Sequence, residues 1–373
     1  MGGDASVLDD GGTRSMRVSR YRTVSRRLAA LGTHAATQLL AEAVPTGAGI
    51  GGRTAVLTVE GVPVFVKKVP LTDLERRTGH IRSTANLFGL PGFYQYGIGS
   101  AGFGAWRELA AHQCTTDWVL RGNYPGFPLL YHWRVMPQQP PGIQPADLQR
   151  QVTHWDASPA VRTRLTAIGR STAAVVLFLE HLPYTVDAWL TEQITAGGSA
   201  APRALAMVDR DLAGGTRFLQ SRGLWHFDAH FHNLLTDGHR VYFADFGLAA
   251  SSRFDLNPAE RIFLHRHAAY DRCYTATHLT QWLVSTLLQI PWAHCHTYLR
   301  DNLPDRRYTD LPPAAARIVA RHAPVATLMG EFFQRLLTVS KSTPYPAKPL
   351  HHALHVARPS SRGTGTPSRS LTR

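Results

Sequence analysis

The stretch GLWHFDAHFHNLLTDGHRVYFADFGLA, residues 223–249, constrains this chain more than any other, because it fixes the spacing of three polar residues around a strong turn signal. Asn233 follows Asp228 by five residues, and Asp245 follows Asn233 by twelve. Between them, two short apolar runs flank Asp237-Gly238, a pair typical of a tight β-hairpin. Since a hairpin folds the chain back on itself, we expect Asp245 to return to the neighbourhood of Asn233.

A carboxylate and an amide oxygen that meet in this way suit a hard cation. Mg²⁺ prefers oxygen ligands, keeps several waters and is shared with phosphates, so Asn233 and Asp245 are candidate ligands. Asp228, close by, could orient an attacking hydroxyl and accept its proton. The plain alternative is that all three residues only cap local turns, as Asp and Asn side chains often do.

The same stretch resembles the catalytic core of the protein kinase superfamily, whose pattern is HRDxxxxN, then a hairpin, then DFG. Upstream, VPVFVKKVPL (62–71) resembles the family's third strand and assigns Lys67, one of only four lysines, as the phosphate-binding lysine. GAGIGG satisfies the GxGxxG pattern through Gly47, Gly49 and Gly52. LFLEHLP (177–183) resembles the hinge strand, where the backbone of Glu180 and Leu182 would bind adenine.

The resemblance implies an α+β, bilobal, protein-kinase-like fold. We expect a β-rich N-lobe over residues 29–180 and a helical C-lobe over residues 181–340. A hairpin is predicted around Glu60-Gly61, and helices are predicted over residues 105–120, 185–194, 203–222, 258–270, 274–289 and 313–337. The terminal segments 1–28 and 341–373 offer little apolar area to offset the entropy of ordering, so we expect both to be disordered, the second as a basic tail.

The function implied by the resemblance is transfer of the γ-phosphoryl group of ATP to a hydroxyl acceptor. The glycines would let backbone amides approach the phosphates, Lys67 would bind the nonreacting phosphates, and Glu108, in the predicted helix 105–120, would pair with Lys67. The apolar face of that helix, with Trp106 and Leu109, nevertheless places Glu108 on another side. Asn233 and Asp245 would hold Mg²⁺, and Asp228 would deprotonate the acceptor.

Several residues depart from the protein-kinase pattern. Phe227 stands where regulated protein kinases carry arginine, and His230 stands where Ser/Thr kinases carry lysine. His230 matches the HGDLHPGN loop of the aminoglycoside and choline phosphotransferases, in which it would contact the transferring phosphate or the acceptor. NPAE (257–260) is interpreted as a helix start, with Asn257 as the N-cap. The acceptor, protein Ser/Thr or small molecule, stays open.

Two other classes of protein remain as alternatives. Phe65 replaces the small alanine that normally roofs the adenine site, which leaves room for a pseudokinase acting as an interaction scaffold. A metallohydrolase would instead surround zinc with Asp228, Asp245 and the histidines of the loop, His226, His230 and His232. In the kinase interpretation, His226 is a structural residue that braces the loop.

Charge and composition bear on partners and location. The formal net charge is +14, but the arginines are spread along the whole chain, so we expect no specific nucleic-acid partner. No apolar run approaches the roughly 20 residues of a membrane span, and the N-terminus lacks the apolar stretch of a secretory signal. Cys114, Cys273 and Cys295 show no pairing or zinc-type spacing, so we predict a cytoplasmic protein.

Overall fold

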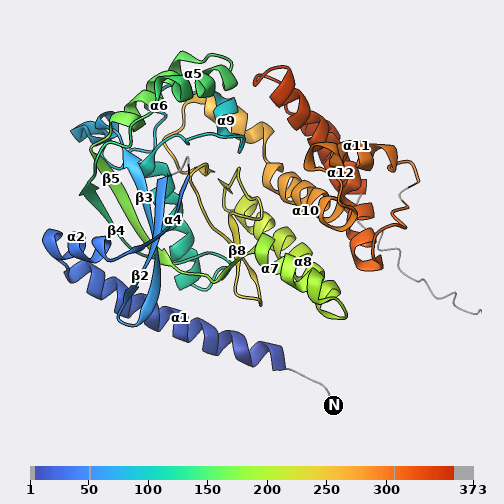
Figure 1. The fold of residues 1–373 in the computed structure, drawn as a ribbon, viewed down its shortest axis with the longest axis horizontal. Coiled ribbons are helices and arrows are strands. Elements are labelled where there is room, and N and C mark those ends of the chain that lie inside the picture. Colours follow the sequence, from blue (N-terminus) through green and yellow to red (C-terminus); the bar gives the residue numbers. More distant parts are fainter. Residues whose placement is uncertain (1–4, 50–51, 306, 357–373) are drawn as a thin grey trace, which may run out of the picture.

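The computed structural model describes residues 5–49, 52–305 and 307–356. They form a mixed α+β structure in which a five-stranded antiparallel sheet and a largely helical region lie next to each other (Figure 1). Across these residues, none of the helices has both the length and the apolar character needed to cross a membrane.

The sheet has the strand order β1-β2-β3-β5-β4. Its strands are β1 (Val44–Gly49), β2 (Gly52–Val59), β3 (Val62–Leu71), β4 (Leu130–Pro137) and β5 (Ala173–Glu180). Runs rich in valine and threonine favour these extended segments. The predicted hairpin is confirmed: Glu60 and Gly61, with φ of 50° and 75°, form the two-residue turn between β2 and β3.

The two faces of the sheet pack against different helices. One face packs against α4 (Ala105–Leu120), which lies between β3 and β4 in the chain. The contacting residues are Val69, Val175 and Leu177 of the sheet and Trp106 and Leu109 of α4. The other face joins the main core, together with α1 (Ala5–Ala30) and α2 (Thr33–Ala41). Because side chains alternate along a strand, Lys67 lies on the α4 face and its neighbour Lys68 on the other.

After β5 the chain is mostly helical. The major helices are α7 (Val186–Ala196), α8 (Ala200–Ser221), α9 (Pro258–Arg266), α10 (Tyr270–Leu288), α11 (Cys295–Asp301), α12 (Pro313–Thr338) and α13 (Ala347–Val356). The five helices predicted after residue 184 correspond to α7, α8, α9, α10 and α12. Short strands lie among them: β6 (Tyr184–Thr185), β7 (Leu224–Trp225), β8 (Leu234–Thr236), β9 (Val241–Phe243) and β10 (Ala250–Ser251).

Two long connections leave the same end of the sheet and pack on each other. Residues 72–104, between β3 and α4, contain α3 (Asp73–Arg76) and the 3-10 turns η1 (Thr78–His80) and η2 (Gly92–Gln95). Residues 138–172, between β4 and β5, contain α5 (Pro145–His154) and α6 (Pro159–Arg170). Tyr94 and Trp155 lead a small hydrophobic core shared by these connections, with ring centroids 4.6 Å apart.

The predicted disorder of residues 1–28 is wrong for residues 5–28, which form most of α1. Val24 and Leu28 are fully buried in the main core. The Arg17 side chain donates to both carboxylate oxygens of Glu180, at 2.9 and 2.6 Å, and to two backbone carbonyls. These contacts stabilise a helix that the composition of the segment alone did not predict. Residues 1–4 lie outside the described residues.

The predicted disorder of residues 341–373 is also wrong for residues 341–356. Lys341 is buried and donates from Nζ to the carbonyl of Leu336 at 2.9 Å. Leu350, Ala353 and Leu354 of α13 are buried in the main core, so a short amphipathic helix supplies the apolar area that this segment lacked on average. Residues 357–373 lie outside the described residues.

Candidate active site

Lys67 is the centre of a group of ion pairs between the sheet and its neighbours. Its Nζ lies 2.7 Å from Oε1 of Glu108 and 2.6 Å from Oδ1 of Asp245. The side chains of Lys67 and Glu108 are 5% and 3% exposed, whereas that of Asp245 is 41% exposed. The predicted pairing of Lys67 with Glu108 is therefore present. The expectation that Glu108 lies off the buried face of its helix is wrong, because α4 is buried around most of its circumference.

The charges in this group shift one another's pKa values. Burial opposes the charge of Lys67, but Asp245 and Glu108 outweigh it and raise the pKa of Lys67 above its ordinary value. Burial would also raise the pKa of Asp245, yet the lysine lowers it to about 2. Burial raises the pKa of Glu108 to about 7, and Lys67 offsets only part of this. Two carboxyl groups thus share one lysine, and a second cation near Asp245 would be favoured.

Asp271 of α10 holds the loop that carries Asp228 by hydrogen bonds to its backbone. The backbone N–H groups of His226 and Phe227 donate to its carboxylate at 2.7 and 2.9 Å. Phe227 has a φ of 65°, in the left-handed region that costs a non-glycine residue energy, so these bonds and the contact of its ring with Tyr270 (4.8 Å) hold a strained backbone. His226 braces the loop, since its Nε2 lies 2.8 Å from the carbonyl oxygen of Ala244.

Asp228 and Asn233 are linked directly. The Asn233 side-chain amide donates to the backbone oxygen and to Oδ2 of Asp228, both at 3.0 Å. The other carboxylate oxygen, Oδ1, lies 3.7 Å from Nε2 of His230. Burial, followed by the negative charge of Asp245, raises the pKa of Asp228 to about 7. Burial lowers the pKa of His230, so Asp228 faces a largely neutral imidazole.

The predicted hairpin around Asp237-Gly238 is confirmed. Strands β8 and β9 pair antiparallel, and the N–H of Ala244 donates to the carbonyl of Asn233 at 3.1 Å. The chain therefore returns as expected, and Asp245, the next residue, lies beside Asn233. The Asx and hydroxyl bonds within the turn, such as His239 N–H to Asp237 Oδ1 at 2.9 Å, show that turn capping accounts for Asp237.

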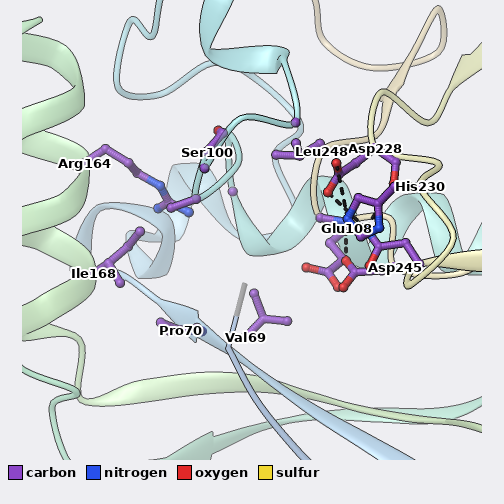
Figure 2. A pocket seen from close by; sticks show the side chains of 16 residues that line it. Val69, Pro70, Ser100, Glu108, Arg164, Ile168, Asp228, His230, Asp245 and Leu248 are labelled. Atoms are coloured by element: carbon purple, nitrogen blue, oxygen red, sulfur yellow. Dashed lines mark hydrogen bonds and ion pairs between the residues drawn. The ribbon is translucent and has the colours of Figure 1, made fainter. Parts of the chain in front are cut away.

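One cavity of about 360 Å³ is lined by Glu108, Asp228, His230, Asn233 and Asp245. Figure 2 shows Glu108, Asp228, His230 and Asp245 gathered on one side of it, with Arg164 and Ile168 of α6 on the other. Residues of the segment 97–104 form a further wall. Gly97 lies so close to Asp228 that a Cβ atom at this position would overlap Oδ1. The backbone of residue 97 can therefore lie this close to Asp228 only because the residue is glycine.

The side-chain oxygens of Asn233 and Asp245 are of the type that a hard cation prefers. The Asn233 nitrogen is engaged by Asp228, which leaves its side-chain oxygen as the ligand atom, and Asp245 contributes a partly exposed carboxylate. In the described part of the chain, no group of three or more His, Cys, Asp or Glu side chains is arranged to hold a metal ion by itself. Zinc ligation is not favoured, because both ring nitrogens of His226 are engaged by backbone groups. A cation here would need ligands from another molecule, such as phosphate oxygens.

The predicted glycines lie at the turn between β1 and β2. Gly47 and Gly49 belong to β1, and Gly52 pairs with Gly49 at the start of β2. Gly52 has a φ of 135°, and a Cβ atom there would overlap the carbonyl oxygen of Lys68, so this position requires glycine. Residues 50–51 lie outside the described residues, and no contact of these glycines tests a role in phosphate binding.

Of the predicted hinge residues, Glu180 is the last residue of β5 and Leu182 lies in the connection to β6. The Glu180 N–H donates to the carbonyl of Leu129 at 2.8 Å, and its carboxylate binds Arg17 of α1. Sequence reasoning gave Glu180 only a backbone role, whereas its side chain ties α1 to the end of β5. Leu182 is partly buried in the connection that follows. Phe65 lies on the Lys67 face of β3, partly buried beside the α4 cluster.

Sequence reasoning missed three residues of this site. Asp271 carried a weak signal, since it is the one acidic residue of α10 and lies in the first turn of that helix. Gly97 lies in the glycine-rich segment YGIGSAGFG (96–104), whose composition indicates only a loop. Arg164 is buried and forms an ion pair with Glu75 of α3 at 2.8 Å, and nothing in the sequence distinguishes it from the chain's many other arginines.

No protein-family model matches this chain, and a search of curated proteins finds no match.

Proposed function

We propose that this chain is an ATP-dependent phosphotransferase with a bilobal, protein-kinase-like fold. The order of the elements supports the fold: three strands, a helix, two further strands and a connection at residues 181–183, followed by the mainly helical part. The strand order β1-β2-β3-β5-β4, with α4 packed on the face that carries Lys67, agrees with the same arrangement. The N-lobe would extend to Glu180 and would include α1.

One observation carries the proposal: Glu108, Asp228, Asn233 and Asp245, from three separate parts of the chain, line one cavity, and Lys67 from a fourth part lies buried behind it, in contact with Glu108 and Asp245. A structural ion pair would require only Lys67 and Glu108. The remaining three residues offer two oxygen ligands and a carboxyl group with a pKa of about 7, which suits a proton acceptor at neutral pH.

Each side chain then has a role in transfer. Lys67, held by Glu108, binds the nonreacting phosphates of ATP. Asn233 and Asp245 would hold Mg²⁺, which would neutralise charge on the phosphates. Asp228 orients the acceptor hydroxyl, whose oxygen attacks the γ-phosphorus while the bond to the bridging oxygen of ADP breaks, and Asp228 takes the proton. His230 lies beside Oδ1, where it contacts the acceptor or the transferred group.

The acceptor is a hydroxyl group of a protein or of a small molecule. All three cysteines are free thiols, which fits a reducing compartment such as the cytoplasm.

A pseudokinase scaffold is the second candidate, favoured by one observation. Phe65 places a large, partly buried ring on the Lys67 face of β3, where it narrows the space for adenine. In that case Mg·ATP would bind weakly or not at all, while the ion pairs of Lys67 would serve the fold.

Labelled ATP decides between these candidates. The purified chain is incubated with γ-labelled ATP and Mg²⁺, alone and with protein and small-molecule acceptors, beside Asp228→Asn. We expect label transfer by the wild type and a loss of orders of magnitude in the variant, with circular dichroism showing that both are folded. No transfer to any acceptor, together with no thermal shift on addition of Mg·ATP, would favour the scaffold.

A further inference from the structure

A second hollow lies on the other side of the segment that covers Asp228. It is a groove of about 430 Å³ between α10, α12, the 3-10 turn η3 (Trp292–His294) and residues 97–98. Gly97 lines both this groove and the cavity that contains Asp228 and Asp245. Gly97, which has no side chain, is therefore a wall shared by the two spaces.

The groove is apolar and carries no formal charge in its lining. Tyr274, His278, Trp292 and Phe333 supply most of its aromatic wall, and none of the described residues that line it is Asp, Glu, Lys or Arg. Trp292 and Leu337 are 44% and 52% exposed, although large apolar side chains are favoured inside. An apolar surface of this kind beside a polar site marks a place where an apolar molecule binds.

The aromatic wall is connected to the loop of Asp228. His278 accepts a hydrogen bond at Nε2 from the N–H of Phe231, at 3.2 Å, and its ring centroid lies 6.2 Å from that of His230. On the open side, the His278 ring lies 5.0 Å from Trp292 and 6.3 Å from Tyr274. A molecule against these rings would thus contact His278, whose ring is a neighbour of His230, the residue that faces Oδ1 of Asp228.

An extended peptide has little room at this point. The segment before α4 covers the residues that follow Asp245: the Gln95 side chain donates to the carbonyl of Leu248, and a Cβ atom at Gly102 would overlap the carbonyl oxygen of Gly247. The backbone after Asp245 is thus covered by the chain itself. The size of the groove is that of a site for one small molecule.

We propose that this groove binds the acceptor, and that the acceptor is a small, uncharged alcohol with an aromatic or aliphatic body. The inference rests on the proposed phosphotransferase function, because only then is a hydroxyl needed at Asp228. The body of the molecule lies against Trp292, Tyr274 and Phe333, and its hydroxyl reaches toward Oδ1 of Asp228 past Gly97.

Binding is tested first, without ATP or Mg²⁺. Saturation-transfer NMR on the full chain uses 2-phenylethanol, indole-3-ethanol and 1-hexanol as probes, with glycerol as the polar control. We expect transfer to at least one apolar alcohol and none to glycerol. Trp292→Ala and Leu337→Ala should remove the signal, whereas Val339→Ala should keep it, because Val339 is 73% exposed but does not line the groove. No binding of any probe, or binding that both lining variants retain, overturns the proposal.

Turnover separates this inference from the proposed function. With labelled ATP, Mg²⁺ and the alcohol that binds, Trp292→Ala should raise the KM for the alcohol about tenfold, as the loss of one large aromatic contact predicts, and leave the KM for ATP unchanged. Label transfer to proteins but to none of the alcohols would overturn the groove's role and leave the phosphotransferase standing. Alcohol binding without any Mg·ATP turnover would overturn the phosphotransferase and, with it, the groove as an acceptor site.

Discussion

Replacing Lys67 by methionine probes the buried group on which the site is built. Methionine preserves much of the apolar stem but removes the cation from Glu108, which is 3% exposed, and from Asp245. Removing one partner of a buried ion pair costs about 3–5 kcal/mol. The Asp245 side chain is 41% exposed, so solvent screens its share, which adds at most about 1 kcal/mol. We expect Lys67→Met to lower the free energy of unfolding by about 4 kcal/mol at pH 8.

The size of this loss should depend on pH. In the wild type, Lys67 holds the pKa of Asp245 at about 2, so this carboxylate stabilises the fold above about pH 4 and the contribution disappears as the pH falls toward 2. Without Lys67, burial and the negative charge of Asp245 act unopposed on Glu108, whose pKa rises further. The folded variant then binds protons that the unfolded chain releases, so its stability falls as the pH rises. The difference from the wild type is therefore larger at pH 8 than at pH 5.

Urea unfolding followed by tryptophan fluorescence at both pH values measures the effect. Lys68→Met is the matched control: Lys68 is the next residue, lies on the other face of β3 and forms no ion pair among the described residues, so a change below about 0.5 kcal/mol is expected. Adding Glu108→Gln to Lys67→Met should recover part of the loss, because it removes the unpaired buried charge. A loss under about 1 kcal/mol, or equal losses at both pH values, would refute the reasoning.

Three further predictions concern the loop, its proton acceptor and the N-terminal helix. Because the pKa of Asp228 is about 7 and its ionised form takes the proton, kcat/KM for transfer should rise about tenfold per pH unit below pH 7 and level off above it; a flat profile from pH 5 to 8 would contradict this role. Asp271→Asn replaces the carboxylate that accepts hydrogen bonds from the N–H groups of His226 and Phe227 with an amide. We expect it to lower kcat and to lower the free energy of unfolding by about 1–3 kcal/mol in urea titrations. An unchanged kcat would show that Asp271 does not position the loop. Arg17→Met leaves the Glu180 carboxylate without its partner and should cost about 3 kcal/mol and speed cleavage of α1 in limited proteolysis; wild-type cleavage rates would mean that α1 does not depend on this contact.

Local patterns with a direct chemical meaning were predicted correctly from the sequence. The turn at Asp237-Gly238 follows from two residues that tolerate tight backbone angles, and it brings Asp245 to Asn233. The resemblance of VPVFVKKVPL to the family's third strand selected Lys67 rather than Lys68, and Lys67 is the lysine that pairs with Glu108 of α4. The capping box of Asn257 and Glu260 is confirmed by bonds at 2.9 and 3.0 Å.

What the sequence could not give depends on contacts between distant segments. Glu108 lies off the apolar stripe of its helix, and it is buried where Lys67 of β3 and Asp245, both distant in the sequence, lie against it. Arg17 orders α1 through Glu180, 163 residues away. Gly97 could not be distinguished from other loop glycines. It matters because it lies against Oδ1 of Asp228, and the sequence around Gly97 does not indicate that contact.

The central claim is that Lys67, Asn233 and Asp245 together hold Mg·ATP. Isothermal titration of the full chain with a nonhydrolysable ATP analogue tests it most directly, in the presence of Mg²⁺ and again with EDTA. Saturable binding that requires Mg²⁺, that weakens at least tenfold in Asp245→Ala and that stays unchanged in Lys68→Met is the predicted result. Absence of binding to the wild type, or equal binding by Asp245→Ala, would contradict the account.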